Sequence, residues 1–262
     1  MGSKRQRLTP AGRPVSVSVI IPALNEEGAI VRAIESAKAA KLDSEFVTLK
    51  EIIVVDGESS DDTVERARAA GAQVISCLKH RARQLNAGAA EASADYLVFL
   101  HADSVLPDEY GRLVHEACHG YQADTGQAAP WGCFETIQID ESGMRMNLLR
   151  WGVAARTKLL HLPYGDQCIF VATDVFRRHQ GFQELDLMED LDLVRRLNRH
   201  EGPPVIVPAP VQTSSRRWQK LGLLRTTLTN QVLILAWLCG IPESTLARWY
   251  RIGTGTQQQI KN

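Results

Sequence analysis

The first hundred residues alternate short apolar runs with longer segments in which polar and apolar residues recur at a helical period. The apolar runs are typical of strands buried in a parallel sheet, because they lack the polar face of an exposed strand. The predicted strands are 15–21, 51–56, 72–77 and 96–100, and the predicted helices between them are 25–40, 63–70 and 81–92. This β-α-β-α-β-α-β order predicts an α/β fold with a mostly parallel sheet and right-handed crossovers.

The second half is less regular, and its predicted elements are more widely spaced. They are strands at 133–139 and 167–171, helices at 107–119, 144–160, 173–179, 189–200 and 221–239, and a last short helix that ends near Tyr250. We expect this half to extend the sheet and form the second wall of a cleft. The predicted organisation is a flexible tail at 1–14, one α/β domain at 15–220 and a C-terminal helical extension at 221–262.

Composition narrows the class of protein. The 262 residues are 44% hydrophobic and 23% charged, which is typical of a soluble globular protein. Thirty basic residues balance thirty acidic ones, so no global field favours nucleic acid as a partner. Five cysteines form no CxxC pair, which indicates reduced thiols and a cytoplasmic location.

Neither end of the chain contains a convincing membrane span. The N-terminus is polar and basic, and the most apolar stretch, 232–241, has about half of the ~20 residues that a spanning helix needs. We predict no transmembrane segment. The apolar helix after Leu221 is interpreted as core or as the face of a homodimer, with contact to a membrane surface as the lesser alternative.

Two carboxylates follow buried strands in the first half. Asp56 ends the run EIIVVD, and Asp103 follows the run YLVFL in the segment FLHAD. The carboxyl ends of parallel strands meet at one edge of a sheet and border the ligand crevice, so these side chains are expected to lie near each other. A site for a nucleoside diphosphate with a divalent metal would account for both carboxylates. The alternative is that each carboxylate caps a neighbouring helix or turn. A basic cluster that suits phosphate lies between them, at Lys79, His80, Arg81 and Arg83.

Several ordered blocks resemble a known family. The segments VSVIIPALNEE, EIIVVDGESSDDT, RARQLNAGA and FLHAD, followed by PYGDQCIFV and GFQELDLMEDLDLVRRL, are similar to family 2 glycosyltransferases with the GT-A fold. The resemblance covers 15–218 and is closest to a subgroup of transferases associated with radical-SAM and selenium-related genes. It implies a hexosyltransferase that uses a nucleotide-diphosphate sugar and Mn²⁺ or Mg²⁺.

The resemblance also implies roles for individual residues of the donor site. Asp56 would contact the base, Arg83 would lie near the base or diphosphate, and Asp103 would hold the metal. His101 stands where the family's DxD motif has its first Asp, so one carboxylate of that motif remains. The implied nucleotide-binding mouth of the first strand consists of Pro22, Leu24 and Glu26.

The implied catalytic residues are Glu189 and Asp190, which match the family's ED motif, with Asp190 as the general base. Without the resemblance, Glu189 and Asp190 can also be interpreted as an acidic first turn of the predicted helix 189–200, stabilised by the helix dipole. The family's QxxRW pattern is half present, because Ser214 stands in place of Gln. The candidate residues for the acceptor or sugar pocket are Trp131, Asp166, Gln167, Arg217 and Trp218.

The sequence therefore favours an inverting, metal-assisted glycosyltransferase with an acceptor that the motifs do not identify. One alternative is a noncatalytic nucleotide-binding or scaffold protein, since one carboxylate of DxD is missing. A sugar-phosphate nucleotidyltransferase is less favoured because no GGxGTRL-like loop follows the first strand. A dinucleotide-dependent oxidoreductase is disfavoured because GxGxxG is absent there.

Overall fold

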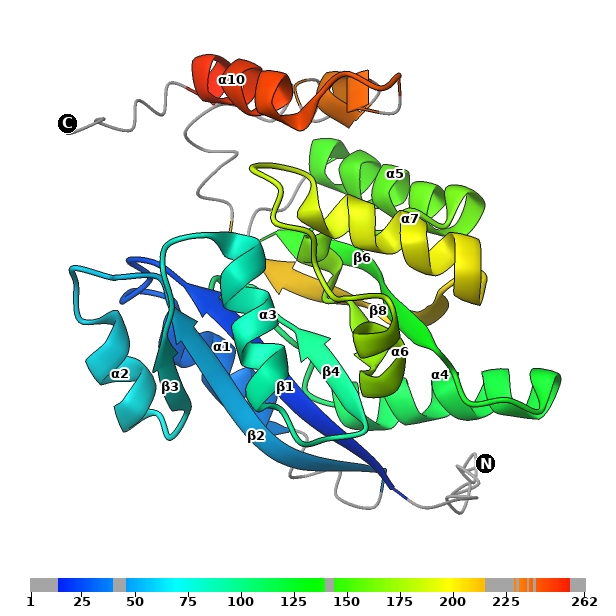
Figure 1. Cartoon of the computed structure of the whole chain (residues 1–262). Coiled ribbons are helices and arrows are strands. Elements are labelled where there is room, and N and C mark those ends of the chain that lie inside the picture. The colour runs from blue at the N-terminus through cyan, green and yellow to red at the C-terminus, as the bar shows by residue number, and fades with distance from the viewer. Residues whose placement is uncertain are drawn as a thin grey trace.

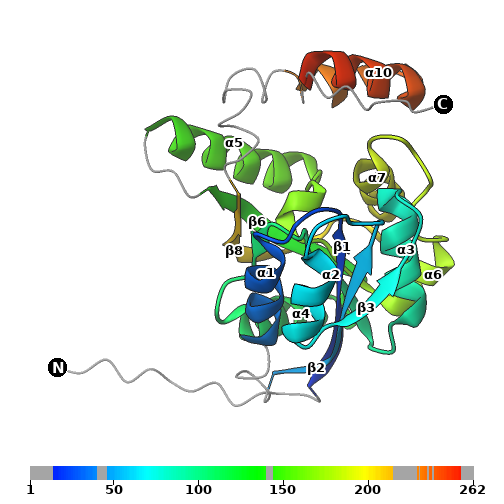
Figure 2. The same cartoon turned by 90° about the vertical axis from the view of Figure 1, so that its left-hand side faces the viewer.

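The computed structural model describes residues 14–39, 46–139, 144–214, 229, 231–234, 236–237 and 239–254. In this part of the chain a single sheet of eight strands has the order β3-β2-β1-β4-β7-β6-β8-β5, with helices on both of its faces (Figures 1 and 2). The strands are β1 (Val15–Ala23), β2 (Val47–Asp56), β3 (Gln73–Ser76), β4 (Tyr96–Phe99), β5 (Ser104–Val105), β6 (Trp131–Ile139), β7 (Phe170–Ala172) and β8 (Val205–Thr213).

The first half forms the parallel sheet that the sequence predicts. Strand β1 pairs in parallel with β2 and β4, and β2 pairs in parallel with β3. The four residues of β4 are all buried, as the apolar run predicts for a central strand. The helices between these strands are α1 (Ile30–Lys38), α2 (Thr63–Ala69) and α3 (Arg81–Glu91).

Two clusters of buried side chains cover the two faces of the sheet. One cluster joins β1, β2 and β4 to α1, α2 and α4 (Tyr110–Thr125), and the other joins them to α3, α6 (Thr173–Arg178) and α7 (Glu189–Glu201). Alternate residues of one strand serve different faces, since Val19 packs in the first cluster and Ile20 in the second. The carboxyl ends of β1, β2 and β4 therefore emerge between two helical layers.

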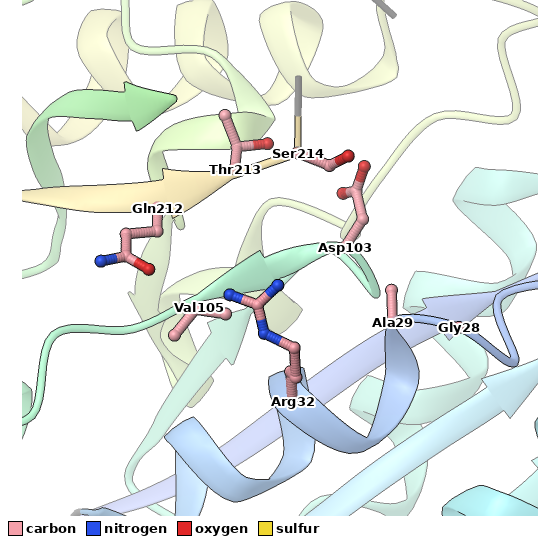
Figure 3. Close-up of a pocket in the computed structure, with 8 residues that line it drawn as sticks. All are labelled: Gly28, Ala29, Arg32, Asp103, Val105, Gln212, Thr213 and Ser214. Atoms are coloured by element: carbon pink, nitrogen blue, oxygen red, sulfur yellow. The ribbon is translucent and has the colours of Figure 1, made fainter. Parts of the chain in front are cut away.

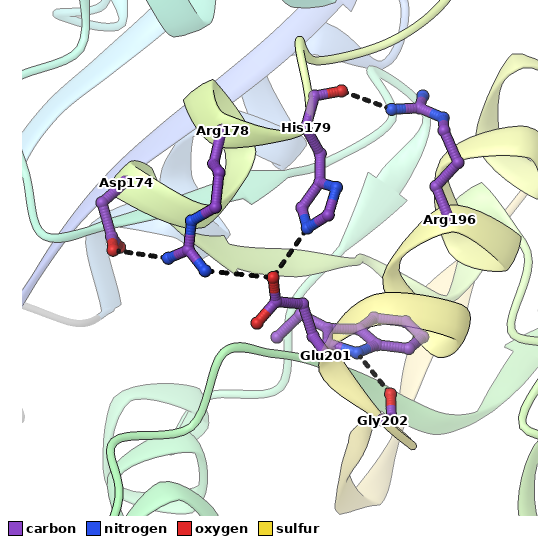
Figure 4. Close-up of polar contacts among 7 residues, drawn as sticks. Asp174, Arg178, His179, Arg196, Glu201 and Gly202 are labelled. Atoms are coloured by element: carbon purple, nitrogen blue, oxygen red, sulfur yellow. Dashed lines mark hydrogen bonds and ion pairs between the residues drawn. The ribbon is translucent and has the colours of Figure 1, made fainter.

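A cluster of ion pairs and hydrogen bonds ties α6 to the C-terminal end of α7. The carboxylate of Glu201 accepts hydrogen bonds from His179 at 2.7 Å and from Arg178 at 3.2 Å, and Arg196 donates to the carbonyl of His179 at 2.5 Å (Figure 4). Arg178 also pairs with Asp174 one turn earlier on α6. These contacts fix the position of α7 relative to α6. The N-terminal turn of α7 lies at the edge of the sheet.

The second half extends the sheet with both parallel and antiparallel strand pairs. The sequence predicts only some of these strands. Strand β7 runs antiparallel to β4 and β6, β8 runs parallel to β6, and β5 runs antiparallel to β8. The helix α5 (Met144–Leu160) has the predicted bounds. The predicted strand at 167–171 is displaced, because Gly165–Gln167 forms a 3₁₀ turn, labelled η2, and the strand starts at Phe170.

The N-terminal bounds of α1 and α4 differ from those predicted. The predicted helix start at residue 25 is wrong, because Asn25 has a φ of 54° and the helix begins five residues later at Ile30. The side chain of Asn25 accepts a hydrogen bond from the backbone of Ser60. Likewise α4 begins at Tyr110 rather than at Pro107.

Little of the C-terminal extension can be compared with its prediction. Much of the predicted helix at 221–239 lies outside the described residues, as does nearly all of the tail at 1–14. Helix α10 (Glu243–Thr254) is present at the C-terminal end, on the same side of the molecule as α5 and α7 (Figure 1). The guanidinium of Arg195 lies 4.8 Å from the ring of Trp237, which links this segment to α7. Among the described residues, no helix has the length and apolar character to span a membrane.

Candidate active site

The loops after β1 and β2 are joined by reciprocal hydrogen bonds at the carboxyl edge of the sheet. The backbone N–H of Asn25 donates to Ser59 at 2.9 Å, and the N–H of Ser60 donates to Asn25 at 2.8 Å. One residue on, the N–H of Glu26 donates to the hydroxyl of Thr63 at 2.8 Å. This pairing fixes the mouth of the first strand, where Pro22, Leu24 and Glu26 are all partly buried.

Asp56 is buried beneath this mouth, with 5% of its surface exposed. Its carboxylate accepts backbone N–H groups from Glu58 and Ser59 at 3.1 to 3.3 Å, so it closes the turn that follows β2. The turn requires a left-handed φ of 69° at Glu58. The structure thus supports the capping role of Asp56, and a carboxylate with several lone-pair sites retains acceptor capacity for a ligand.

Gln84 on α3 is a site residue that sequence reasoning did not single out. Its side chain is buried, and its amide nitrogen donates to the carbonyl of Ala23 at 2.9 Å and to that of Val55 at 2.8 Å. It therefore ties α3 to the carboxyl ends of β1 and β2. The sequence signal for this position is a polar residue on the face of α3 that packs on the sheet, beside the buried residues Ala82 and Leu85.

Asp103 lies where the chain turns from β4 into β5, and it lines a pocket of about 250 Å³ (Figure 3). The walls come from the start of α1, from β5 and from the end of β8. The described lining residues are Gly28, Ala29, Arg32, Asp103, Val105, Gln212, Thr213 and Ser214. The structure therefore leaves Asp103 at the rim of an open pocket, whereas Asp56 is enclosed by its own turn.

The start of α7 supplies a second pair of acidic side chains. Asp190 accepts the backbone N–H of Gly165 at 2.7 Å through one oxygen and the N–H of Leu191 at 2.8 Å through the other. Glu189 is buried and pairs with Arg81, with 3.0 Å between Oε1 and Nε. These contacts join the ED segment to η2 on one side and to α3 on the other.

Gly165 and His101 bring the two halves of the site together. A Cβ placed on Gly165 would lie 3.0 Å from the Oδ2 atom of Asp190 and 3.0 Å from the Nε2 atom of His101. His101 also contacts Arg81 through Nε2. The HAD segment after β4, the PYGDQ loop and the ED segment of α7 therefore meet at Gly165, with Arg81 linking them from α3.

Burial controls the ionisation of Glu189. Loss of hydration raises the pKa of this carboxyl above its ordinary value of 4.5, and the neighbouring charge of Asp190 raises it further. The guanidinium of Arg81 opposes both effects. Asp190 has a different environment, because its carboxylate accepts hydrogen bonds from the backbone N–H groups of Gly165 and Leu191.

Two predicted pocket residues lie in the protein interior instead. Trp131 has no exposed surface and donates its indole N–H to the carbonyl of Gly202 at 3.0 Å, so it is a core residue. Gln167 is also fully buried; its amide nitrogen donates to the carbonyls of Phe134 and Glu135, and its oxygen accepts from Arg156. Neither side chain is among the described residues that line the pocket at Asp103, and both are fully buried.

The other predicted residues occupy three kinds of position. Asp166 is partly buried within η2, next to Gly165. Arg83 points to Glu184, at 2.7 Å from Nε to Oε2, and not to the acidic cluster; Arg81, two residues earlier, occupies that position. Arg217 and Trp218 lie outside the described residues.

The donor atoms at Asp103 suit a magnesium or manganese ion only if a ligand completes the coordination. Among the described residues, no group of three or more His, Cys, Asp and Glu side chains is arranged to hold a metal. Mg²⁺ in phosphate-transfer sites is commonly bound by one or two carboxylates together with the phosphates of the substrate. The single carboxylate of Asp103, at the rim of an open pocket, fits that pattern.

Curated relatives match a limited part of this chain. Glucosyl-3-phosphoglycerate synthase of Mycobacterium tuberculosis is 36% identical over 106 residues, which are 37% of this chain and 31% of the relative. Undecaprenyl-phosphate 4-deoxy-4-formamido-L-arabinose transferase of Pseudomonas aeruginosa is 33% identical over 114 residues, 40% of this chain and 33% of the relative. The matched segments thus span about a third of each relative.

Solved structures extend the similarity to the fold. The M. tuberculosis synthase in complex with Mn²⁺, UDP and phosphoglyceric acid has a TM-score of 0.55 and 22% identity, covering 88% of this chain and 80% of that chain. Its complex with Mn²⁺, UDP-glucose and phosphoglyceric acid has a TM-score of 0.55 and 21% identity, covering 88% and 82%. The predicted GT-A type of α/β fold is confirmed.

A family model is matched over more than half of the chain. The model describes glycosyl transferase family 2, and the match runs from residue 18 to residue 179. It includes both loops of the mouth, Gln84, Asp103 and the η2 turn, and it ends before the ED segment. The chain belongs to glycosyl transferase family 2.

Proposed function

We propose that this protein transfers a sugar from a nucleotide-diphosphate sugar to an acceptor hydroxyl, with inversion at the anomeric carbon. The observation that carries the proposal is the meeting of three segments at Gly165, which places Asp190 next to the strand end that bears His101 and Asp103. Family membership supports an enzyme over the noncatalytic scaffold and over the nucleotidyltransferase. UDP is the proposed nucleotide, because the similar M. tuberculosis synthase binds UDP and UDP-glucose.

The residues of the proposed donor site have two tasks: some position the nucleoside, and others balance the charge of the diphosphate. In our proposal the mouth formed by Pro22, Leu24 and Glu26 takes the nucleoside, and Asp56 accepts a hydrogen bond from its base. Asp103 would hold Mn²⁺ or Mg²⁺, as in the complexes of the synthase, and a bound ion would neutralise charge on the departing diphosphate. Arg81, rather than Arg83, is the basic side chain that faces the acidic cluster.

Asp190 is the proposed general base. A positioned carboxylate can take the proton of an acceptor hydroxyl as that oxygen attacks. The N–H groups of Gly165 and Leu191 hold one oxygen each, which fixes the carboxylate while leaving lone pairs that can take the acceptor's proton. The acceptor oxygen would attack the anomeric carbon as its proton passes to Asp190, and the nucleoside diphosphate would leave from the opposite side.

The acceptor is proposed to be phosphorylated. Both kinds of curated relative are named for phosphate-bearing molecules, a phosphoglycerate in one and undecaprenyl phosphate in the other. The likeness to the subgroup associated with radical-SAM and selenium-related genes stays a prediction and names no acceptor. The part of the acceptor wall that Arg217 and Trp218 would form is likewise a proposal.

Isothermal titration of nucleoside diphosphates with and without Mn²⁺ or Mg²⁺ tests the donor site. We expect UDP to bind in the presence of metal and to bind at least ~10-fold more weakly after Asp103→Asn, because the substitution removes the proposed ligand's charge. Asp124→Asn, an exposed aspartate on α4, is the matched control and should bind as the wild type does. Absence of binding by every nucleotide tested would favour the noncatalytic scaffold.

The stereochemistry is a separate test. Proton NMR of the first product formed from an α-linked donor should show a β-linked sugar if Asp190 acts as the base of a single displacement. A product that retains the α configuration would exclude the inverting mechanism and leave the donor assignment intact.

A further inference from the structure

Arg32, the third residue of α1, projects towards the pocket that Asp103 lines. Figure 3 shows its guanidinium extending between Val105 and Asp103, across from the end of β8. None of the motifs that identify the family includes this residue. It is therefore a charged group at the candidate site to which the proposed reaction assigns no role.

The guanidinium of Arg32 is available for a ligand. Its side chain is exposed, and it takes part in no ion pair with any residue that the structure describes. Neighbouring helices offer a contrast, since Arg66 lies 3.9 Å from Asp62 and Arg112 pairs with Glu116 at 2.7 Å. A guanidinium presents five donors in a planar fork, which matches the oxygens of phosphate better than any other side chain.

The remaining walls also offer hydrogen-bond donors. Thr213 and Ser214 contribute hydroxyls and Gln212 an amide, and Asp103 is the one acidic side chain among the eight described lining residues. At Gly28 an added Cβ would meet no atom within 4 Å, so the floor beside α1 is open. A volume of about 250 Å³ is large enough for a phosphoryl group with part of the molecule that carries it.

We propose that this pocket binds a phosphoryl group and that Arg32 is the residue that holds it. The inference rests on the proposed function, because it places the anion beside a cation bound at Asp103. Two sources share this chemistry: the diphosphate of the donor and the phosphate of a phosphorylated acceptor. Arg32 is a binding residue in either case.

Charge balance sets a condition on binding. Among the described lining residues one side chain is basic and one is acidic, so Asp103 repels an anion that Arg32 attracts. When a divalent ion neutralises Asp103, the anion lies between two positive groups. Phosphate should therefore bind more tightly with Mn²⁺ or Mg²⁺ than in the presence of a chelator.

Two titrations of the full chain distinguish the sources. The first measures UDP with Mn²⁺, and the second measures inorganic phosphate with Mn²⁺ after UDP has saturated its site. The variants are Arg32→Gln and Arg32→Lys, with Arg68→Gln as the matched control, because Arg68 is an exposed arginine on α2 that does not line the pocket. Thermal unfolding of each variant checks that the fold is retained.

We expect Arg32→Gln to weaken one of the two ligands about tenfold, as for a lost charge-assisted hydrogen bond, and Arg32→Lys to weaken it less. Weaker phosphate binding with unchanged UDP affinity assigns the pocket to the acceptor; weaker UDP binding assigns it to the donor diphosphate. Equal affinities of wild type and Arg32→Gln for both ligands would overturn the inference. Failure of the wild type to bind UDP with metal would instead refute UDP as the donor nucleotide. The role of Arg32 would still be tested in that case, because inorganic phosphate can be titrated with Mn²⁺ in the absence of UDP.

Discussion

Glu189 and Asp190 are adjacent in sequence, yet the structure gives their carboxyl groups opposite environments. Glu189 is buried against Arg81, and its pKa is raised; Asp190 is held by the N–H groups of Gly165 and Leu191. Two carboxyl groups whose environments differ in this way can take different roles in one reaction. Asp190 suits proton transfer, whereas Glu189 suits the positioning of Arg81.

Asp190→Asn should lower turnover at least ~100-fold, the low end of the effect of losing a general base. The amide keeps an oxygen that can accept the N–H of Gly165, so donor affinity should stay near the wild-type value. Turnover and donor Kd measured on the same preparation separate the two effects. Asp192→Asn is the control on the same helix, because Asp192 pairs with Arg196; near-normal turnover of Asp190→Asn would place the base elsewhere.

Glu189 should make a pH-dependent contribution to stability. Since its folded pKa is raised above the ordinary value of 4.5, the folded state binds more protons than the unfolded state between these two values. The contribution of Glu189 to the free energy of unfolding is therefore largest below about pH 4.5 and falls as the pH rises through the raised folded pKa.

Glu189→Gln does not titrate, so it isolates this contribution. Urea unfolding of the wild type and the variant over the same pH series should show the difference, wild type minus variant, decreasing as the pH rises. A difference that increases with pH would mean that Arg81 dominates and holds the carboxyl in its charged form.

At the scale of elements, the η2 turn carries the geometry of the site. Its residue Gly165 packs against the side chains of Asp190 and His101, and Gln167 anchors it through hydrogen bonds to Phe134, Glu135 and Arg156. Burial of Gln167 thus replaces its predicted contact with a sugar. A rigid turn at this point can hold the base, because the hydrogen bonds of Gln167 anchor the turn within the protein.

Gly165→Ala should impair catalysis more than stability. Its Cβ would lie 3.0 Å from both the carboxylate of Asp190 and the ring of His101, so both side chains must shift. We expect turnover to fall by about tenfold or more, since small misplacements of catalytic groups have large kinetic effects. Circular dichroism and turnover of the variant give the comparison.

The control is Gly152→Ala on α5. An added Cβ there meets no atom within 4 Å, and alanine favours a helix interior over glycine by ~0.5–1 kcal/mol. This variant should be slightly more stable and fully active. Equal activities of the two glycine variants would show that Gly165 does not position Asp190.

The sequence predicts most accurately the elements whose pattern of polar and apolar residues follows directly from their burial. Strand β4 is completely buried, so its sequence is an uninterrupted apolar run. Helix α5 begins and ends at the predicted residues. The sequence does not predict strand β8, because Pro208 and Pro210 lack the N–H that a strand interior uses. The sheet accommodates them with a register shift, in which Phe134 pairs with Val207 and Thr136 pairs with Pro210.

The residues that the sequence did not indicate act through long-range contacts. Gln84 and Arg32 each gain their role from a strand end that is distant along the chain, and contact with the start of α7 selects Arg81 from the predicted basic cluster. By contrast, the positions of Asp56 and Asp103 follow from the rule that parallel strands share a carboxyl edge. The apolar runs in the sequence therefore predict where the strands end, whereas the side chains that surround those ends depend on tertiary packing.

At the scale of the whole molecule, the two halves of the chain share one sheet. The parallel half presents Asp56 and Asp103, and the mixed half, joined through the antiparallel pairing of β4 with β7, presents Gly165 and Asp190. The candidate site is complete only when both halves are folded. A single cooperative domain over 15–220, which remains a prediction, would couple formation of the site to global folding.

The cysteines provide a test of that cooperativity. Cys118, Cys133 and Cys168 are buried in different parts of the sheet and its helices; burial raises the pKa of Cys118 to about 12 and raises the pKa of the other two thiols as well. Reaction with a thiol reagent requires both access and thiolate, so these three should react only through unfolding. Cys239 is exposed and should react rapidly in the native protein, with Cys77 slower.

Mass spectrometry after timed labelling in increasing urea gives the outcome for each thiol. If the domain unfolds as one unit, Cys118, Cys133 and Cys168 become reactive together, with the same dependence on urea, because each requires the same global opening. The variant Cys239→Ser should remove the fast native reaction and leave that transition unchanged. Labelling of Cys118 at lower urea than Cys133 would show that α4 opens before β6, and the domain would then not unfold as one unit.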